Sequence, residues 1–212
     1  MGGIRKIEPF ENHLKEYEDW FEKNGWVYRS ELAAVRERLP KKGDGVEIGV
    51  GSARFAEPLG INFGVEPSPK MRRLARQRGV EVIDGVAENL PFVDGRFDYA
   101  LMVTTICFLS DIELAFKEVF RVLKPNGSFI IGFVDKNSPL GKIYQSKKEK
   151  SLFYKIATFY SVEEVLGVLE KAKFKKFSFT QTVFSGLDKV KEEETAIDGY
   201  GKGSFVVIKA EK

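Results

Sequence analysis

A short apolar strand that runs directly into glycines is the feature that most limits what this chain can fold into. Residues 46–50 form the strand, Gly49 and Gly51 lie at its end, and a helix is predicted to begin near Arg54. Small residues at the carboxyl end of a parallel strand let a nucleotide approach the backbone closely, where side chains would block it. Taken alone, a tight turn without a ligand explains the same residues.

A second predicted strand, residues 61–66, ends in a carboxylate. Glu66 follows Gly51 by 15 positions and stands where an acidic side chain can accept hydrogen bonds from both hydroxyls of a ribose. A solvated glutamate at a strand end is the alternative for Glu66 by itself. Strand, glycine loop, helix, strand and terminal acid in this order predict a site for a nucleoside-type cofactor.

The residues next to the glycines argue against two common nucleotide sites. The dinucleotide fingerprint G-x-G-x-x-G requires a third glycine at position 54, where this chain has Arg54. A phosphate-binding P-loop requires Lys-Ser or Lys-Thr after the glycines, and neither follows. A cofactor without a pyrophosphate is therefore favoured, and S-adenosylmethionine meets this requirement.

Five segments in sequence order resemble the class I S-adenosylmethionine-dependent methyltransferases, in particular the small-molecule branch that includes quinone-biosynthesis methyltransferases. The similarity covers about residues 45–135, and a weaker one extends from Tyr160 through Phe174. The five segments are residues 46–51 (Val-Glu-Ile-Gly-Val-Gly), 64–68 (Gly-Val-Glu-Pro-Ser), 87–92 (Ala-Glu-Asn-Leu-Pro-Phe), 95–99 (Gly-Arg-Phe-Asp-Tyr) and 121–127 (Arg-Val-Leu-Lys-Pro-Asn-Gly).

The resemblance implies a three-layer α/β fold, a Rossmann-like methyltransferase fold with a mostly parallel seven-stranded sheet, an antiparallel C-terminal strand and additional N-terminal helices. Alternating strand and helix patterns from residue 45 onward agree with such a layered domain. We expect a single methyltransferase domain over residues 1–212. Its parts are an N-terminal helical cap (1–44, with helices over 10–23 and 30–39), a cofactor-binding core (45–134), a candidate substrate lid (135–160) and a C-terminal helix and hairpin (161–212).

The resemblance also implies roles for individual residues. Glu47 would lie beneath the glycine loop and order it, Glu66 would hold the ribose hydroxyls, and the backbone amide of Ala87 would bind the adenine. The complete set of cofactor-binding residues that it implies is Glu47, Gly49, Gly51, Glu66, Pro67, Ala87, Glu88, Val103 and Thr104.

The chain departs from the family pattern at two positions. Ala53 stands in place of a third glycine and is small enough to be tolerated. Val86 stands where the family has an aspartate that bonds the adenine amino group, so Asp84 would have to swing round to replace it. Loss of that hydrogen bond would cost about 0.5–1.5 kcal/mol of cofactor binding.

No side chain is assigned a catalytic role, because a sulfonium methyl group is already a strong electrophile. Alignment of the acceptor and exclusion of water are the main requirements, and a base is needed only if the acceptor must lose a proton. His13 and Tyr17, in the first predicted helix, are the two weak candidates. The aromatic residues of this region either pack the N-terminal helices or form a lid over a flat or cationic substrate; they are Tyr17, Trp20, Phe21, Trp26 and Tyr28.

Composition narrows the partners. The formal net charge is +3, from 34 basic and 31 acidic residues, which gives no strong electrostatic reason to expect nucleic acid or a membrane surface. One cysteine and the lack of an apolar span of about 20 residues favour a cytoplasmic location. Abundant Lys and Glu with few Asn and Gln suggest a heat-adapted source. No set of metal ligands is recognised, so no metal is expected.

The sequence therefore predicts a methyltransferase that uses S-adenosylmethionine to methylate an unidentified small molecule, with nitrogen and oxygen acceptors both open. Two alternatives remain. The first is a nicotinamide-dependent oxidoreductase, which Arg54 and the lack of a Tyr-x-x-x-Lys relay oppose. The second is a non-catalytic protein that binds S-adenosylmethionine, for which Val86 is a mild indication. The oligomeric state is left open.

Overall fold

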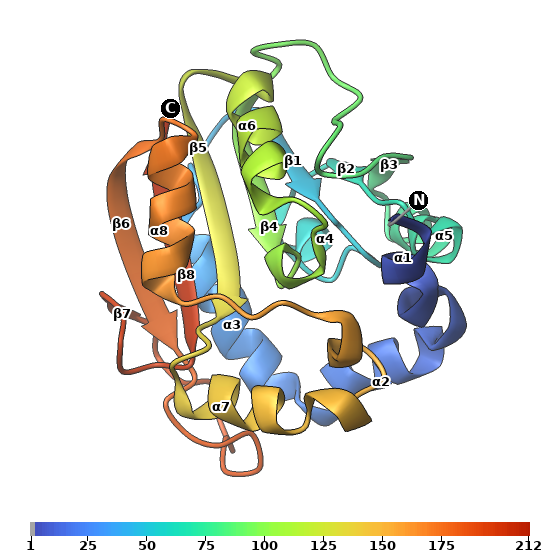
Figure 1. The fold of residues 1–212 in the computed structure, drawn as a ribbon, viewed down its shortest axis with the longest axis vertical. Helices are drawn as coiled ribbons and strands as arrows, with labels where there is room; N and C mark the ends of the chain where they lie inside the picture. Colours follow the sequence, from blue (N-terminus) through green and yellow to red (C-terminus); the bar gives the residue numbers. More distant parts are fainter. Residues whose placement is uncertain (1–2) are drawn as a thin grey trace.

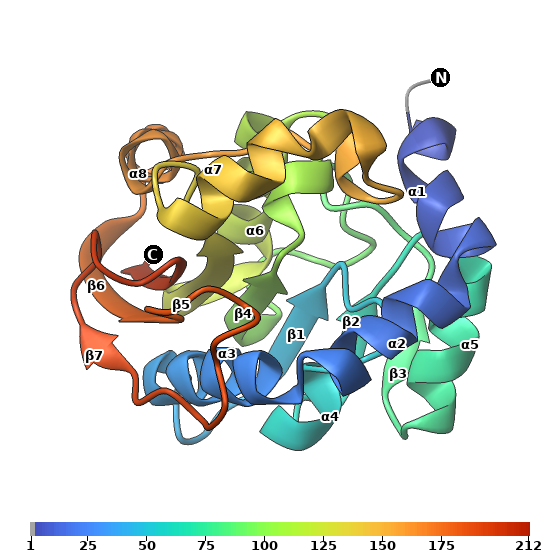
Figure 2. The same cartoon turned by 90° about the horizontal axis from the view of Figure 1, so that it is seen from below.

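One mixed sheet lies between two layers of helices in the computed structural model, which describes residues 3–212 and side chains from residue 6 onward (Figures 1 and 2). The strand order is β3-β2-β1-β4-β5-β8-β6-β7. The strands are β1 Gly45–Ile48, β2 Phe63–Val65, β3 Glu81–Ile83, β4 Phe97–Val103, β5 Leu123–Val134, β6 Lys175–Thr182, β7 Ile197–Asp198 and β8 Phe205–Glu211. Strands β1 to β5 are mutually parallel, so their carboxyl ends meet at one edge of the sheet.

The predicted Rossmann-like fold is confirmed, including the antiparallel C-terminal strand β8, which lies between β5 and β6. The sheet has eight strands where we expected seven. The additional strand is β7, two residues from the long β6–β8 connection that return along β6 and pair with its otherwise free edge.

Side chains from the two faces of the sheet form two separate cores. On β4, Ala100 and Met102 pack into one core, whereas Tyr99, Leu101 and Val103 pack into the other. This alternation follows from the two-residue period of a strand. Helices α6 (Ile112–Val122) and α8 (Val162–Lys171) cover the first core, and helices α3 (Gly25–Arg38), α4 (Ala56–Leu59) and α5 (Pro69–Gln77) cover the second.

The N-terminal region differs from the expected single helix over residues 10–23. Two helices, α1 (Gly3–Asn12) and α2 (Leu14–Lys23), meet at His13, whose φ of −125° and ψ of 44° lie outside the helical region. The break allows α1 to contact α5 while α2 continues toward α3. The next helix, α3, begins at Gly25 rather than near residue 30.

The segment over residues 135–160, which has no regular sequence pattern, is mostly helical. It contains α7 (Pro139–Ser146) and two short 3-10 turns, Lys148–Lys150 and Tyr154–Ile156. Ser138 begins α7 by accepting a hydrogen bond from the Gly141 amide at 3.0 Å. Figure 2 shows α7 and α3 on opposite sides of the sheet, near the carboxyl ends of the parallel strands.

The predicted helix start at Ser161 is confirmed as a capping box, in which Ser161 and Glu164 bond each other's backbone amides. Within the described residues, no helix is both long and apolar enough to cross a membrane.

Candidate functional site

The glycine loop after β1 takes a conformation that side chains would disturb. Gly49 and Gly51 have φ values of +71° and +55°, in the left-handed region. A Cβ atom on Gly49 would lie 2.4 Å from the Thr105 methyl carbon, and one on Gly51 would lie 2.9 Å from the Tyr17 hydroxyl oxygen. Glycine is therefore required at both positions for conformation and for space.

Glu66, just after β2, is held against this loop. The Gly51 amide donates to Oε2 at 2.9 Å and the Ser68 amide donates to Oε1 at 2.8 Å. An ionised carboxylate can accept about four hydrogen bonds, so each oxygen keeps acceptor capacity toward the cavity. Burial raises the pKa of Glu66 to about 7, although the two amides and the charge of Arg72 oppose the shift.

Glu47 lies on β1, two residues before Gly49, and its role in ordering the glycine loop stays a prediction. Glu47 is 2% exposed, and its Oε2 atom has no hydrogen-bond partner among the described residues. Burial raises the pKa of Glu47 well above its ordinary value. The carboxyl group does not line the cavity described next.

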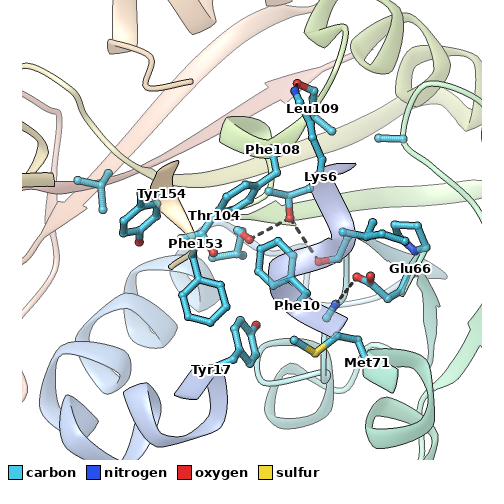
Figure 3. Close-up of a pocket in the computed structure, with 18 of the residues that line it drawn as sticks. Lys6, Phe10, Tyr17, Glu66, Met71, Thr104, Phe108, Leu109, Phe153 and Tyr154 are labelled. Carbon is cyan, nitrogen blue, oxygen red and sulfur yellow. Dashed lines mark hydrogen bonds between the residues drawn. The ribbon is translucent and has the colours of Figure 1, made fainter. Parts of the chain in front are cut away.

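A cavity of about 950 Å³ opens at the carboxyl ends of the parallel strands (Figure 3). It brings together all but one of the nine residues predicted to bind the cofactor: Gly49, Gly51, Glu66, Pro67, Ala87, Glu88, Val103 and Thr104. Its volume lies at the upper end of the range of ~300–1,000 Å³ typical of small-molecule sites.

The turn after β4 closes the floor of the cavity. Thr104 has a φ of +49°, unusual for a β-branched residue, and its amide donates to the Gly132 carbonyl at 2.8 Å. The Thr105 hydroxyl donates toward the carbonyls of Val103 (3.0 Å) and Gly49 (3.3 Å), which ties this turn to the glycine loop (Figure 3).

The two weak catalytic candidates are placed differently. Tyr17 lines the cavity, and burial together with the nearby Glu66 charge raises the pKa of its hydroxyl well above the ordinary range. It is therefore a neutral hydrogen-bonding group near pH 7. His13 is not among the lining residues; its ring lies 3.3 Å from the Glu16 carboxylate.

Asp84 does not swing round to take the place of the missing aspartate. Asp84 pairs with Arg72 at 2.7 Å, its side chain is 72% exposed, and it does not line the cavity. Val86 does line the cavity and is partly exposed. Arg72 is anchored near the end of β2 by the carbonyls of Glu66 and Pro67, and this position draws Asp84 away from the cavity.

Aromatic side chains from distant segments cover the cavity. Phe10 of α1 packs against Phe108 and Phe153, with ring centroids 4.9 and 5.5 Å apart, and Phe153 also contacts Tyr17 (Figure 3). The Lys6 ammonium group donates to the Leu109 carbonyl and fixes α1 over the turn after β4. This arrangement supports the lid interpretation of the N-terminal aromatics for Tyr17, Trp20 and Phe21, which line the cavity, but not for Trp26 and Tyr28, which do not.

Several lining residues were missed by sequence reasoning. They are Lys6, Phe10, Glu31, Phe108, Tyr144, Phe153 and Tyr154. For Glu31 a signal existed: it stands four residues after Val27 and three before Ala34, both buried, so it shares their face of α3. The others come from segments without a family pattern, and nothing local marks them.

Comparisons with known proteins identify the family. Residues 46–131 match the model of a methyltransferase domain. A crystal structure from Thermotoga maritima, described as an S-adenosylmethionine-dependent methyltransferase and possible histamine N-methyltransferase, is 51% identical, covers 97% of this chain and 99% of that one, and superposes with a TM-score of 0.96.

Two curated proteins are also similar to this chain. An uncharacterized protein from Methanocaldococcus jannaschii is 45% identical over 97% of this chain and 100% of its own length. The mitochondrial 2-methoxy-6-polyprenyl-1,4-benzoquinol methylase of Xenopus laevis is 35% identical over 52% of this chain and 42% of its own length. The relatives from Thermotoga maritima and Methanocaldococcus jannaschii come from thermophilic sources, which agrees with the heat-adapted composition of this chain. The chain belongs to the class I S-adenosylmethionine-dependent methyltransferases, on the branch that includes the quinone-biosynthesis methyltransferases, and its cofactor is S-adenosylmethionine.

Proposed function

We propose that this protein transfers the methyl group of S-adenosylmethionine to a nitrogen or oxygen atom of a small molecule. The observation that carries the proposal is one continuous cavity, lined by the glycine loop and Glu66 and also by the rings of α2, α7 and the turn at Tyr154. Its volume is large enough for an acceptor beside the cofactor. The 51% identical protein, a possible histamine N-methyltransferase, supports nitrogen as one candidate acceptor atom.

The proposed cofactor contacts fit the chain's own geometry. Without side chains at Gly49 and Gly51, the methionine part can lie against the backbone. The free acceptor sites of Glu66 suit two ribose hydroxyls, which are donors. Pro67 and Ala87 line the cavity next to Glu66 and Glu88, where the adenine would lie.

The bound cofactor supplies a methyl group on a positively charged sulfur. The acceptor's lone pair would take up this methyl group, and an acceptor that carries a proton would lose it to a base or to water. The protein's part is to align the acceptor and exclude water, which the aromatic cover formed by Phe10, Tyr17 and Phe153 supports. Tyr17 remains protonated and can orient an acceptor but does not serve as a base at neutral pH.

Calorimetry and labelled methyl transfer test this function together. We expect saturable binding of S-adenosylmethionine and not of NADH, followed by transfer of label to members of a panel of amines, phenols and carboxylic acids. Binding without transfer to any member would favour the non-catalytic alternative. Binding of NADH in place of S-adenosylmethionine would refute the proposal.

A further inference from the structure

Glu31 is a buried carboxylate that lines the cavity and has no part in the cofactor contacts. It lies on α3, is 4% exposed, and is among the lining residues. Burial alone raises the pKa of Glu31 to about 8; no charged or hydrogen-bonding neighbour within the described part of the chain contributes to the shift. Because an unpaired buried charge costs several kcal/mol, such groups ordinarily pair with a cation. A cationic ligand would provide the partner that the described side chains do not.

The side chains around Glu31 suit a cation. Burial raises the hydroxyl pKa values of Tyr144 of α7 and Tyr154, and the charge of the nearby Glu31 adds to both shifts; their ring centroids are 4.7 Å apart. Trp20 of α2 lines the same cavity. Aromatic ring faces attract ammonium groups, with the strongest effect in desolvated sites. The exposed Lys147 and Lys150 also line the cavity, but they do not contribute to the pKa of Glu31.

Glu31 lies on the acceptor side of the cavity. Helix α3 packs against β6, β8 and β5, and Val134 at the end of β5 lines the cavity. Strand β5 is three positions from β2 in the order β2-β1-β4-β5, which is about 14 Å at ~4.8 Å per strand. Glu66, after β2, and Glu31, beside β5, therefore lie toward opposite ends of one cavity. The carboxylate of Glu66 at one end suits the ribose of the cofactor, and the carboxylate of Glu31 at the other end is left for the methyl acceptor.

We propose that the methyl acceptor is a small organic amine, bound as its cation by the carboxylate of Glu31 and by the rings of Trp20, Tyr144 and Tyr154. This inference rests on the proposed methyl transfer and specifies its substrate class. Neutral phenols and alcohols of the same shape lack the charge that would pair with Glu31. Since Glu31 is mostly protonated at pH 7 while the two tyrosines stay neutral, binding of the cation drives off the Glu31 proton. Before transfer, the ammonium proton passes to the ionised Glu31 carboxylate, which frees the nitrogen lone pair to bond the methyl carbon.

The test uses the full chain saturated with S-adenosylhomocysteine, so that no transfer occurs. The probes are histamine and 2-phenylethylamine, with 2-phenylethanol as the neutral match of the second. Calorimetry at pH 7 in two buffers of different ionisation enthalpy measures affinity and proton release. We expect at least one amine to bind at least 10-fold more tightly than the alcohol, with release of close to one proton.

Two variants localise the effect. Glu31→Gln keeps the size of the side chain and removes its charge; it is expected to weaken amine binding about 10- to 100-fold and to abolish the proton release, as for a lost charge-assisted bond. Glu16→Gln removes the same charge from another residue that lines the cavity, at a more exposed position, and is expected to leave both unchanged. Binding of S-adenosylhomocysteine by each variant reports that it is folded.

The outcomes separate this inference from the proposed function. A wild-type protein that does not bind S-adenosylhomocysteine would refute the proposed function and this inference with it. A protein that binds S-adenosylhomocysteine but binds neither amine, or binds them no better than the alcohol, would overturn the inference alone. Equal effects of Glu31→Gln and Glu16→Gln would do the same.

Discussion

Cofactor affinity should depend on pH through Glu66. Its pKa of about 7 means that the carboxyl group is mostly protonated at pH 6 and mostly ionised at pH 8. A protonated carboxyl group has one oxygen that donates rather than accepts, whereas two ribose hydroxyls need two acceptors. We therefore expect the cofactor to bind the ionised form and to displace the proton at low pH.

The size of the effect follows from the ionised fractions. With a pKa near 7, about 9% of Glu66 is ionised at pH 6 and about 91% at pH 8, so the Kd should rise about 10-fold between pH 8 and pH 6. A 10-fold change corresponds to about 1.4 kcal/mol of binding free energy. Calorimetric titration with S-adenosylhomocysteine, which does not turn over, measures this directly.

The matched control is Glu66→Gln, which keeps the side-chain size but cannot ionise. It should bind the cofactor more weakly at pH 8, by about 1.5–3 kcal/mol. The cofactor's own amino group titrates in the same way with both proteins, so the difference between the two pH profiles isolates Glu66. A wild-type profile that matches the Glu66→Gln profile would show that Glu66 does not bind the cofactor in its ionised form.

Three further predictions concern other parts of the site. Gly49→Ala should lose cofactor binding and about 1–3 kcal/mol of stability, because Gly49 has a positive φ and an added Cβ would lie 2.4 Å from Thr105. The control is Gly60→Ala, at a φ of +72° with open space around it. It should lose about 1 kcal/mol of stability and bind the cofactor normally. Equal losses of cofactor binding would refute the steric argument. Val86→Asp, which restores the family aspartate, should tighten cofactor binding by about 0.5–1.5 kcal/mol in the same titration, and unchanged or weaker binding would contradict this. Glu31 keeps its proton to about pH 8 when folded and loses it near pH 4.5 when unfolded, so wild-type stability should fall as pH rises through this window, by at most about 4–5 kcal/mol. Glu31→Gln should therefore gain stability over the wild type at pH 9 relative to pH 5 in chemical denaturation, and a constant difference would refute the assignment.

The core of the fold and the cofactor end of the cavity could be predicted because their determinants are local. Glycines with positive φ, the acid after β2 and the Ser161 cap each act within a few residues. The break at His13 and the pairing of β7 depend on partners far along the chain, and their residues carry no equivalent signal.

The sequence by itself determined the family, the cofactor and the position of Glu66, because each follows from short-range order along the chain. The tertiary structure alone decided which residues line the end of the cavity away from Glu66. Glu31 stands more than a hundred residues before Tyr144 and Tyr154, and the folding of α3 and of the segment after β5 around the same cavity brings them together. The position of the Asp84 side chain also depends on the tertiary structure. Arg72 holds Asp84 outside the cavity, because an ion pair depends on distance in space rather than on position in sequence.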